Sequence, residues 1–228
     1  MRYIAIILAT CFFSSPIFFS SLAWAAADLK VKAENLTENG KIKADYAYCA
    51  PAAEKPKAEK HVEDGKNKRP ALSWSAGPKE TLSYAVVVVD SEVPTDFSDA
   101  NQENKTIPAA QKRQDFYHWL QVDIPASVTM LPEGAGRGAL KTPLKVGVAG
   151  VNDYPVFMKK PAAEFIGYDG PCPPWNDEKI HKYHFKVYAL NTASLGLKEG
   201  FSWKEAMKLI AKHTVAMGEF VADYSLLK

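Results

Sequence analysis

The pattern of hydrophobic and polar positions predicts two long β-strands near the middle of the chain. Tyr84 to Asp90 is a run of apolar, mostly β-branched residues that ends on an acid, which is typical of a strand buried on both faces. The next segment, Phe116 to Ile124, alternates with a period of two. This alternation puts on one face Phe116, His118, Leu120, Val122 and Ile124. We therefore expect His118 on the more apolar face of the second strand.

Shorter segments extend this β pattern along the chain. Lys145 to Ala149 and Tyr183 to Leu190 are further strand candidates, and Leu72 to Trp74 is a short one. Loops, rather than regularly spaced helices, separate these segments. This arrangement favours a mainly β fold with antiparallel strands over a parallel α/β sheet.

A single helix is predicted near the C-terminus. Ser202 is a good N-cap, and Glu205 at the third helical position completes a capping box. Apolar residues recur at helical spacing from Trp203 to about Met217, which predicts one face packed on the core. Gly218 is expected to end the helix.

Two polar stretches read as surface insertions. Residues 52–70 are rich in Lys, Glu, Pro and Ala, and 96–114 is similarly polar, with a short helical turn expected around Ala109 to Gln114. Strand-like segments of the same character lie on both sides of each stretch. We therefore expect residues 26–228 to form one domain with polar insertions near 52–70 and 96–114.

The first 25 residues have the pattern of a cleaved signal peptide. Arg2 precedes an apolar stretch that ends on Ala23-Trp24-Ala25, and small residues allow cleavage after Ala25 or after Ala27. Serines and a proline interrupt the stretch well short of the ~20 apolar residues that span a bilayer. We therefore expect a periplasmic or secreted protein that is not transmembrane.

Charge argues against a nucleic-acid-binding protein. Loss of residues 1–25 removes Arg2 and no acid, so the formal net charge falls from +2 to +1. Nucleic-acid-binding domains normally have a strongly basic face. The remaining ~200 residues suffice for a sizeable core.

Cys11 is lost with the signal peptide, so the mature chain retains Cys49 and Cys172. In an oxidising compartment they either form one disulfide that closes a long loop or remain two buried thiols, because sequence alone does not give the distance between them. No second Cys or His lies two to four residues from either one, which argues against a cysteine metal site.

Three polar segments could together form a small pocket. They are Asp90 to Pro94, His118-Trp119, and the segment Gly167 to Tyr183. The last contains Gly-Pro-Cys-Pro-Pro, a stiff backbone, followed by His181 and Tyr183, which point to the same face of a strand.

These segments resemble, in order, the motifs of the phosphatidylethanolamine-binding protein family. Asp90-Ser91-Glu92-Val93-Pro94 is similar to its Asp-Pro-Asp-Ala-Pro motif, and His118-Trp119 to its His-Trp strand. Gly170 to Pro174 with His181-Lys182-Tyr183 resembles its Gly-x-x-Pro-Pro and His-Arg-Tyr signature. Ile124-Pro125 and Leu131-Pro132-Glu133-Gly134 point to the bacterial, Raf-kinase-inhibitor-like branch.

The resemblance implies an antiparallel β-sandwich of two sheets with a C-terminal helix and a shallow anion-binding pocket. It implies these ligand-binding residues: Asp90, Glu92, His118, Gly170, Pro171, Cys172, Pro174, His181 and Tyr183. Imidazole groups, backbone N–H groups between Gly170 and Cys172 and the Tyr183 hydroxyl would donate to the anion, while Asp90 would accept from a histidine. Ser91 and Glu92 depart from the family motif, and the 96–114 insertion could cover or reshape the pocket mouth.

The function that follows is an exported, non-catalytic binding protein for a phosphorylated or anionic small ligand such as phosphate or a phospholipid head group, without cofactor or metal. One alternative is an inhibitor or modulator of a partner protein such as a protease or kinase. Another is a metal-assisted hydrolase that uses Asp90, His118 and His181. The sequence leaves the oligomeric state open, a homodimer included.

Overall fold

The computed structural model describes residues 27–52, 61–135 and 144–227. Their largest sheet has eight strands. In spatial order these are β11 (Val148–Ala149), β9 (Arg113–Pro125), β8 (Ser83–Pro94), β12 (His181–Leu190), β13 (Thr214–Tyr224), β4 (Lys41–Ile42) and β3 (Thr37–Glu38), with β1 (Ala27–Asp28) paired to β13. The long central strands are antiparallel to one another, whereas β1 and β4 run parallel to β13.

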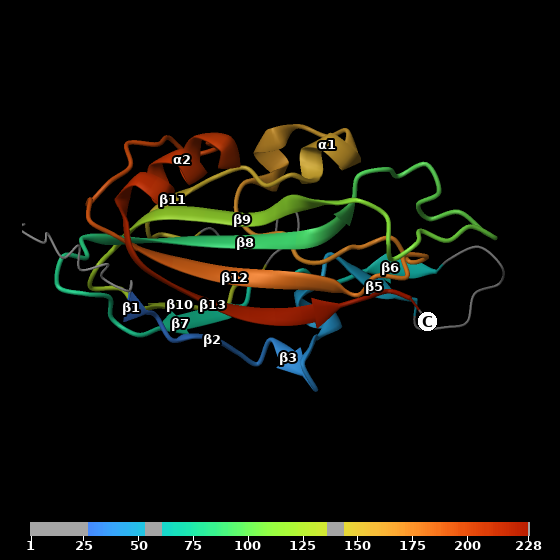
Figure 1. Cartoon of the computed structure of the whole chain (residues 1–228), viewed down its shortest axis with the longest axis horizontal. Coiled ribbons are helices and arrows are strands. Elements are labelled where there is room, and N and C mark those ends of the chain that lie inside the picture. The colour runs from blue at the N-terminus through green and yellow to red at the C-terminus, as the bar shows by residue number, and fades with distance from the viewer. Residues whose placement is uncertain (1–26, 53–60, 136–143, 228) are drawn as a thin grey trace, which may run out of the picture.

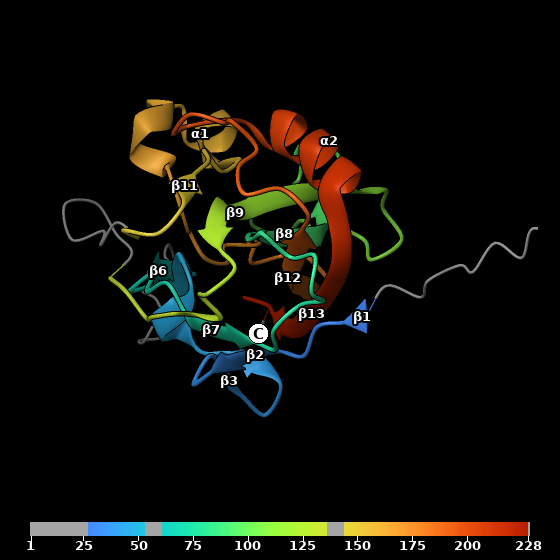
Figure 2. The ribbon, with the colours of Figure 1, turned by 90° about the vertical axis from the view of Figure 1, so that its left-hand side faces the viewer.

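A smaller sheet packs below the main one (Figure 1, Figure 2). Its three strands are β10 (Met130–Leu131), β7 (Ala71–Trp74) and β2 (Val31–Glu34). A two-stranded ribbon of β5 (Cys49–Pro51) and β6 (Val62–Asp64) lies near one end of the molecule. The predicted mainly β, two-sheet fold with a C-terminal helix is confirmed.

Two helices cover the outer face of the main sheet (Figure 1). They are α1 (Tyr154–Met158) and α2 (Trp203–His213), and short 3-10 turns occur at Ala44–Tyr46 and Ala162–Phe165. Neither helix of the described residues has the length and apolar character needed to cross a membrane.

Strand β8 is buried on both faces, as its sequence predicts. Val86 and Val88 belong to the core between the two sheets, together with Trp119 and Phe185. The residues that alternate with them, such as Val87, pack under helix α2. The sheet therefore separates two hydrophobic cores, and β8 contributes to each.

The predicted face of β9 is only partly right, because the strand is irregular at two places. Its pairing with β8 shifts between Val88 and Val89, opposite His118, and again near Asp123, which has a positive φ of 56°. As a result Leu120 packs under α2, while Ile124 packs between the sheets. The simple alternation of Phe116, His118, Leu120, Val122 and Ile124 is therefore wrong.

The end of the C-terminal helix was also predicted wrongly. The capping box at Ser202 and Glu205 is present, but the helix ends at His213 and strand β13 begins at Thr214. Gly218 lies inside β13, where a Cβ would come 1.9 Å from the carbonyl oxygen of Leu29. Pairing with β12 over the length of β13 outweighs the helical pattern of this segment.

The two polar stretches are more ordered than their composition suggests. Within 52–70, Val62–Asp64 form β6 and Asn67 is fully buried, while residues 53–60 lie outside the described part. Around 109–114 there is a turn closed by Gln111 N–H to the Pro108 carbonyl, not a helical turn, and β9 begins at Arg113.

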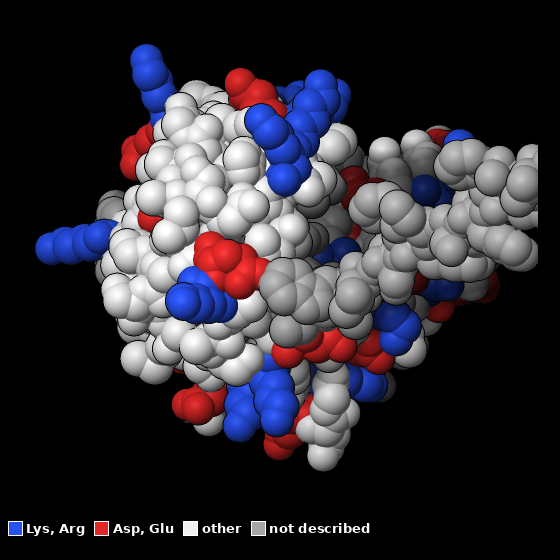
Figure 3. Space-filling view, turned by 60° about the vertical axis from the view of Figure 1, so that its left-hand side comes forward, with Lys and Arg blue, Asp and Glu red and all other residues white. Residues whose placement is uncertain are grey.

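Residues 1–25, expected to be a signal peptide, also lie outside the described residues. Over the face seen in Figure 3, acidic and basic side chains are interspersed, in line with the small net charge.

Candidate functional site

Three neighbouring strands meet at the candidate site. Strand β8 ends where its antiparallel neighbours β9 and β12 begin, and Asp90 is in register with Phe116 on one side and Tyr183 on the other. His181 lies two residues before Tyr183 and so shares its face. The sheet register alone therefore brings together side chains that are far apart in sequence.

His118 reaches the same place through the irregularity in β9. Its ring makes an edge contact with Tyr183, with the centroids 5.2 Å apart. Nδ1 lies 2.8 Å from the carbonyl oxygen of Asp169, and the Asp169 N–H donates back to the carbonyl of His118 at 3.0 Å. Because a carbonyl oxygen can only accept, Nδ1 carries a hydrogen and Nε2 of the neutral ring is an acceptor.

Asp90 and His181 form a buried ion pair. Oδ2 of Asp90 lies 2.6 Å from Nδ1 of His181, and both side chains are almost fully buried. The other oxygen of Asp90 accepts from the Glu92 N–H at 2.8 Å. The expected contact of Asp90 with a histidine is thus present, and the partner is His181.

A second carboxylate, which the sequence did not single out, contacts the opposite nitrogen of this ring. Oδ2 of Asp177 lies 3.2 Å from Nε2 of His181. Arg113 in turn binds both oxygens of Asp177, at 2.6 and 3.0 Å, and donates to the carbonyl of Glu92. Asp177 lies in the loop before β12 and Arg113 is the first residue of β9, so only the fold brings them to His181.

These surroundings set opposite protonation states for the two histidines. Burial alone would lower the pKa of His181, but hydrogen bonds and charge from Asp177 and Asp90 outweigh it and raise this pKa to about 9. For His118 burial dominates and lowers the pKa to about 4. At neutral pH His181 is therefore a cation and His118 is neutral.

A cavity of about 310 Å³ opens at these residues. Six of the predicted site residues line it, namely Asp90, His118, Cys172, Pro174, His181 and Tyr183. Glu92, Gly170 and Pro171 are not part of the lining. Glu92 is instead 3.5 Å from Lys179, and the Pro171 carbonyl accepts from the backbone N–H groups of Tyr48 and Cys49.

The remaining lining residues were missed by the sequence analysis. They are Val93, Phe97, Asn101, Phe116, Tyr154, Phe157, Met158 and Pro173. Phe97 and Asn101 come from the polar insertion and Phe157 and Met158 from α1 and its end. Val93 and Pro173 lie inside the predicted pocket segments, although neither was chosen as a ligand-binding residue. Phe116 had a detectable signal, since it lies two residues before His118 in a strand.

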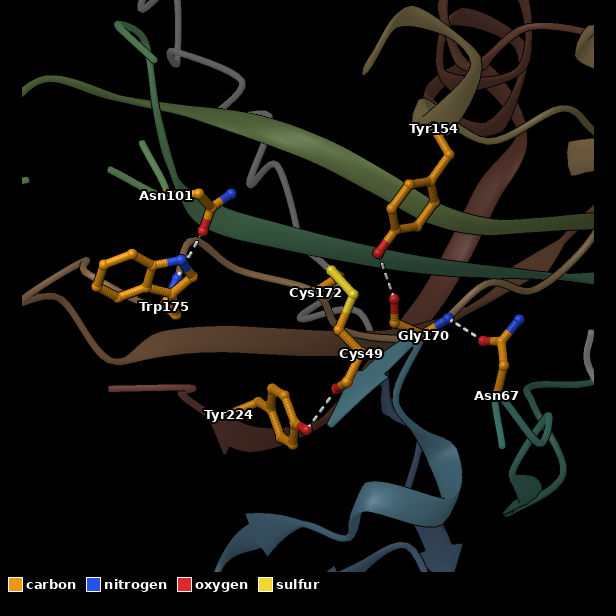
Figure 4. Close-up of a disulfide and its surroundings, with 8 residues drawn as sticks. All are labelled: Cys49, Asn67, Asn101, Tyr154, Gly170, Cys172, Trp175 and Tyr224. Carbon is orange, nitrogen blue, oxygen red and sulfur yellow. Dashed lines mark hydrogen bonds between the residues drawn. A yellow bond between two sulfur atoms is a disulfide. The ribbon is translucent and has the colours of Figure 1, made fainter. Parts of the chain in front are cut away.

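Gly170 does not line the cavity, and its backbone N–H already has a partner within the protein. Its N–H donates to Asn67 Oδ1 at 2.7 Å and its carbonyl accepts from the Tyr154 hydroxyl at 2.6 Å (Figure 4). A Cβ at this position would come 2.0 Å from the carbonyl oxygen of Tyr46. Only glycine fits such an approach of two backbone segments.

A disulfide joins Cys49 to Cys172, next to this segment (Figure 4). It links the β5 ribbon to the cavity wall, since Cys172 lines the cavity and Cys49 begins β5. The Cys49 carbonyl also accepts from the hydroxyl of Tyr224, at 2.7 Å. Of the two alternatives for these cysteines, the structure contains the bridge, and it fixes the proline-rich wall to the ribbon.

The other histidines lie outside the cavity lining. His184 contacts Glu219 at 3.0 Å, and His213 contacts Asn191. His61 stacks on Trp175 with the ring centroids 3.7 Å apart. Within residues 27–52, 61–135 and 144–227, no cluster of three or more His, Cys, Asp or Glu side chains could hold a metal ion.

The fold and the cavity define a mainly β protein with a small cavity where three adjacent strands meet. The model of the family described as phosphatidylethanolamine-binding protein matches residues 32–225. The chain therefore belongs to the phosphatidylethanolamine-binding protein family, as its motifs indicated.

Several bacterial proteins are similar over most of the chain. The UPF0098 protein YbcL of Escherichia coli K12 is 33% identical over 164 residues, which cover 72% of this chain and 74% of YbcL. A UPF0098 protein of Aquifex aeolicus is 32% identical over 71% of this chain and 76% of its own length. The crystal structure of E. coli YbcL, described as a new member of the mammalian PEBP family, superposes with a TM-score of 0.63 at 26% identity, covering 87% of this chain and 99% of that chain.

Proposed function

We propose that this chain is an exported, non-catalytic binding protein for a small phosphorylated or anionic ligand. The observation that carries the proposal is the cavity at Asp90, His118, His181 and Tyr183, whose polar groups come from three adjacent strands and the stiff segment before β12. Membership of the phosphatidylethanolamine-binding protein family favours a phosphorylated ligand.

The protonation state of His118 makes this binding depend on pH. Nδ1 of His118 already donates to the Asp169 carbonyl, so His118 can donate to an anion only when its Nε2 is protonated. In the protein without a ligand, the pKa of His118 is about 4. An anion at Nε2 favours the charged ring and so raises that pKa. Binding of an anion is therefore coupled to uptake of one proton, unless the ligand brings a proton of its own.

The absence of a catalytic function is part of the proposal. Among the described residues that line the cavity there is no serine, threonine or lysine, and the sulfur of Cys172 is in a disulfide. Histidines without a serine, threonine, lysine or free thiol beside them support binding rather than covalent catalysis by such a nucleophile.

Export is supported by residues 1–25 and by the disulfide. Disulfides persist in the periplasm and outside the cell and are rare in the cytosol. Mass spectrometry of the protein recovered from a periplasmic extract tests export. The mature chain should begin at residue 26 or 28. Recovery of the full-length chain from the cytosol alone would contradict export.

Calorimetry tests the ligand class. The mature protein is titrated with phosphate, phosphoethanolamine and acetate at pH 5 and pH 7.5, each in two buffers of different ionisation enthalpy. We expect tighter binding at pH 5 and, at pH 7.5, a heat that depends on the buffer, because a proton is taken up.

The matched pair of variants is His118→Ala and His213→Ala. Only the first histidine lines the cavity; the second contacts Asn191 at the start of a loop. Loss of binding in His118→Ala with retention in His213→Ala is the expected result. No heat with any ligand, or equal binding by both variants, would overturn the proposal.

A further inference from the structure

Most of the cavity wall is apolar, and its apolar part is continuous. Phe157 packs against Phe97 and Phe116, with ring centroids 4.8 and 5.4 Å away. Phe116 also contacts His118 at 4.7 Å and the ring of Tyr154 at 5.0 Å. Together with Met158 these rings form one wall that leads from the mouth of the cavity to His118.

The charges in contact with His181 balance, so they offer no excess of positive charge. Asp90 and Asp177 are the two carboxylates that contact its ring, and His181 and Arg113 are the two cations bound to them. Asp169, whose carbonyl contacts His118, is a third buried carboxylate and adds no positive charge. Both ring nitrogens of His181 already contact a carboxylate. A bare, multiply charged anion would lose its hydration here and gain few hydrogen bonds, which is costly.

The size of the cavity also argues against a small inorganic ion as the ligand. At about 310 Å³ it falls at the low end of the range for small organic ligands. A compact inorganic ion displaces the volume of only a few water molecules, at ~30 Å³ each. An ion alone would leave the apolar wall uncovered, and uncovered apolar surface contributes nothing to affinity.

We propose that the ligand is an organic anion with an apolar ring or short chain, whose apolar group lies against Phe97, Phe116, Phe157 and Met158 while its anionic end lies at His118. This inference rests on the proposed function and narrows it. It excludes inorganic phosphate and a bare polar head group as the preferred ligand.

Phe157 gives a way to test the wall without disturbing the core. It is 41% exposed, so its removal costs little packing, yet its ring lines the cavity. Phe220 is the matched control, because it is a partly buried phenylalanine on β13 that packs against Phe185 and does not line the cavity.

The experiment compares two pairs of probes in which only the second member carries a phenyl group: phosphate with phenyl phosphate, and acetate with benzoate, where phenyl replaces methyl. Calorimetry on the wild-type mature protein should give about 10- to 100-fold tighter binding of the aromatic member in each pair. Phe157→Ala should reduce this preference at least several-fold and change phosphate affinity little. Phe220→Ala should leave both affinities unchanged.

The outcomes separate this inference from the proposed function. Equal affinity within each pair, or a preference that Phe157→Ala does not reduce, overturns the inference and leaves the anion site standing. Absence of binding by all four probes overturns the anion site itself. If uncharged benzene or phenol bound as tightly as phenyl phosphate, the claim that the ligand needs an anionic group would be wrong.

Discussion

Oδ2 of Asp177 lies 3.2 Å from Nε2 of His181, on the side of the ring opposite to Asp90. The ring is therefore held between two carboxylates, and Arg113 compensates the second of them. An anion that is to bind at Nε2 of His181 must first displace Asp177. This arrangement makes His118, rather than His181, the histidine available to a ligand.

Replacement of Asp177 by asparagine should lower the pKa of His181. The variant removes one of the two carboxylates that raise this pKa to about 9, and the pKa should fall toward 6.5. An NMR titration of the histidine ring protons measures it directly. Asp223→Asn is the control, because Asp223 pairs with exposed Lys182, and it should leave the pKa of His181 where it was. An unchanged pKa in Asp177→Asn would contradict the relationship described above.

Stability should fall on both sides of pH 6.5. The pKa of His181 is raised in the folded state, so its contribution is complete below 6.5 and is lost as the pH rises through about 9, a loss on the order of 3 kcal/mol. The pKa of His118 is lowered, so its contribution is complete above 6.5 and is lost as the pH falls through about 4, by a similar amount. Urea denaturation between pH 4 and 9.5 measures both.

A variant of His118 serves as the control for the loss of stability at acid pH. His118→Asn removes the titrating ring while retaining a side-chain donor, and it should flatten the profile below pH 6.5 only. A wild-type profile that is flat from pH 6.5 to 9 would argue against the double contact of His181.

The disulfide should stabilise the protein substantially. Cys49 and Cys172 are 123 residues apart, and closing a loop of that length lowers the conformational entropy of the unfolded chain enough to stabilise the fold by about 5 kcal/mol. The Cys49→Ser, Cys172→Ser double variant should lose about that much free energy of unfolding in guanidinium denaturation. Reductant should destabilise the wild type and leave the variant unaffected; equal stability of the two proteins without reductant would show that the bridge contributes nothing.

Gly170→Ala should destabilise the fold by about 2 kcal/mol or more, because the new Cβ would overlap the carbonyl of Tyr46. Gly40→Ala separates this overlap from backbone strain: Gly40 has a φ of 79° and no atom near its Cβ position, so alanine there should cost only about 1 kcal/mol. Thermal denaturation compares the two. A smaller loss for Gly170→Ala than for Gly40→Ala would rule out the close approach.

Much of the site could be predicted because its motifs are local. Asp90, at the end of an apolar strand, and His181 with Tyr183, two residues apart, follow from strand periodicity, and the family motifs place them in one pocket. Asp177 and Arg113 gave no comparable signal, since a charged residue in a polar loop reads as solvated.

The sequence by itself determined the β class of the fold, the family, the capping box at Ser202 and the strand buried on both faces, because each depends on residues close together along the chain. The tertiary structure alone decided where α2 ends, which way His118 points, which cysteine alternative holds and what lines the cavity. These depend on the pairing of β13 with β12, on the irregularity of β9 and on loops that meet across the fold. Such contacts join residues tens of positions apart, and their free energy outweighs the local preferences that a sequence pattern records.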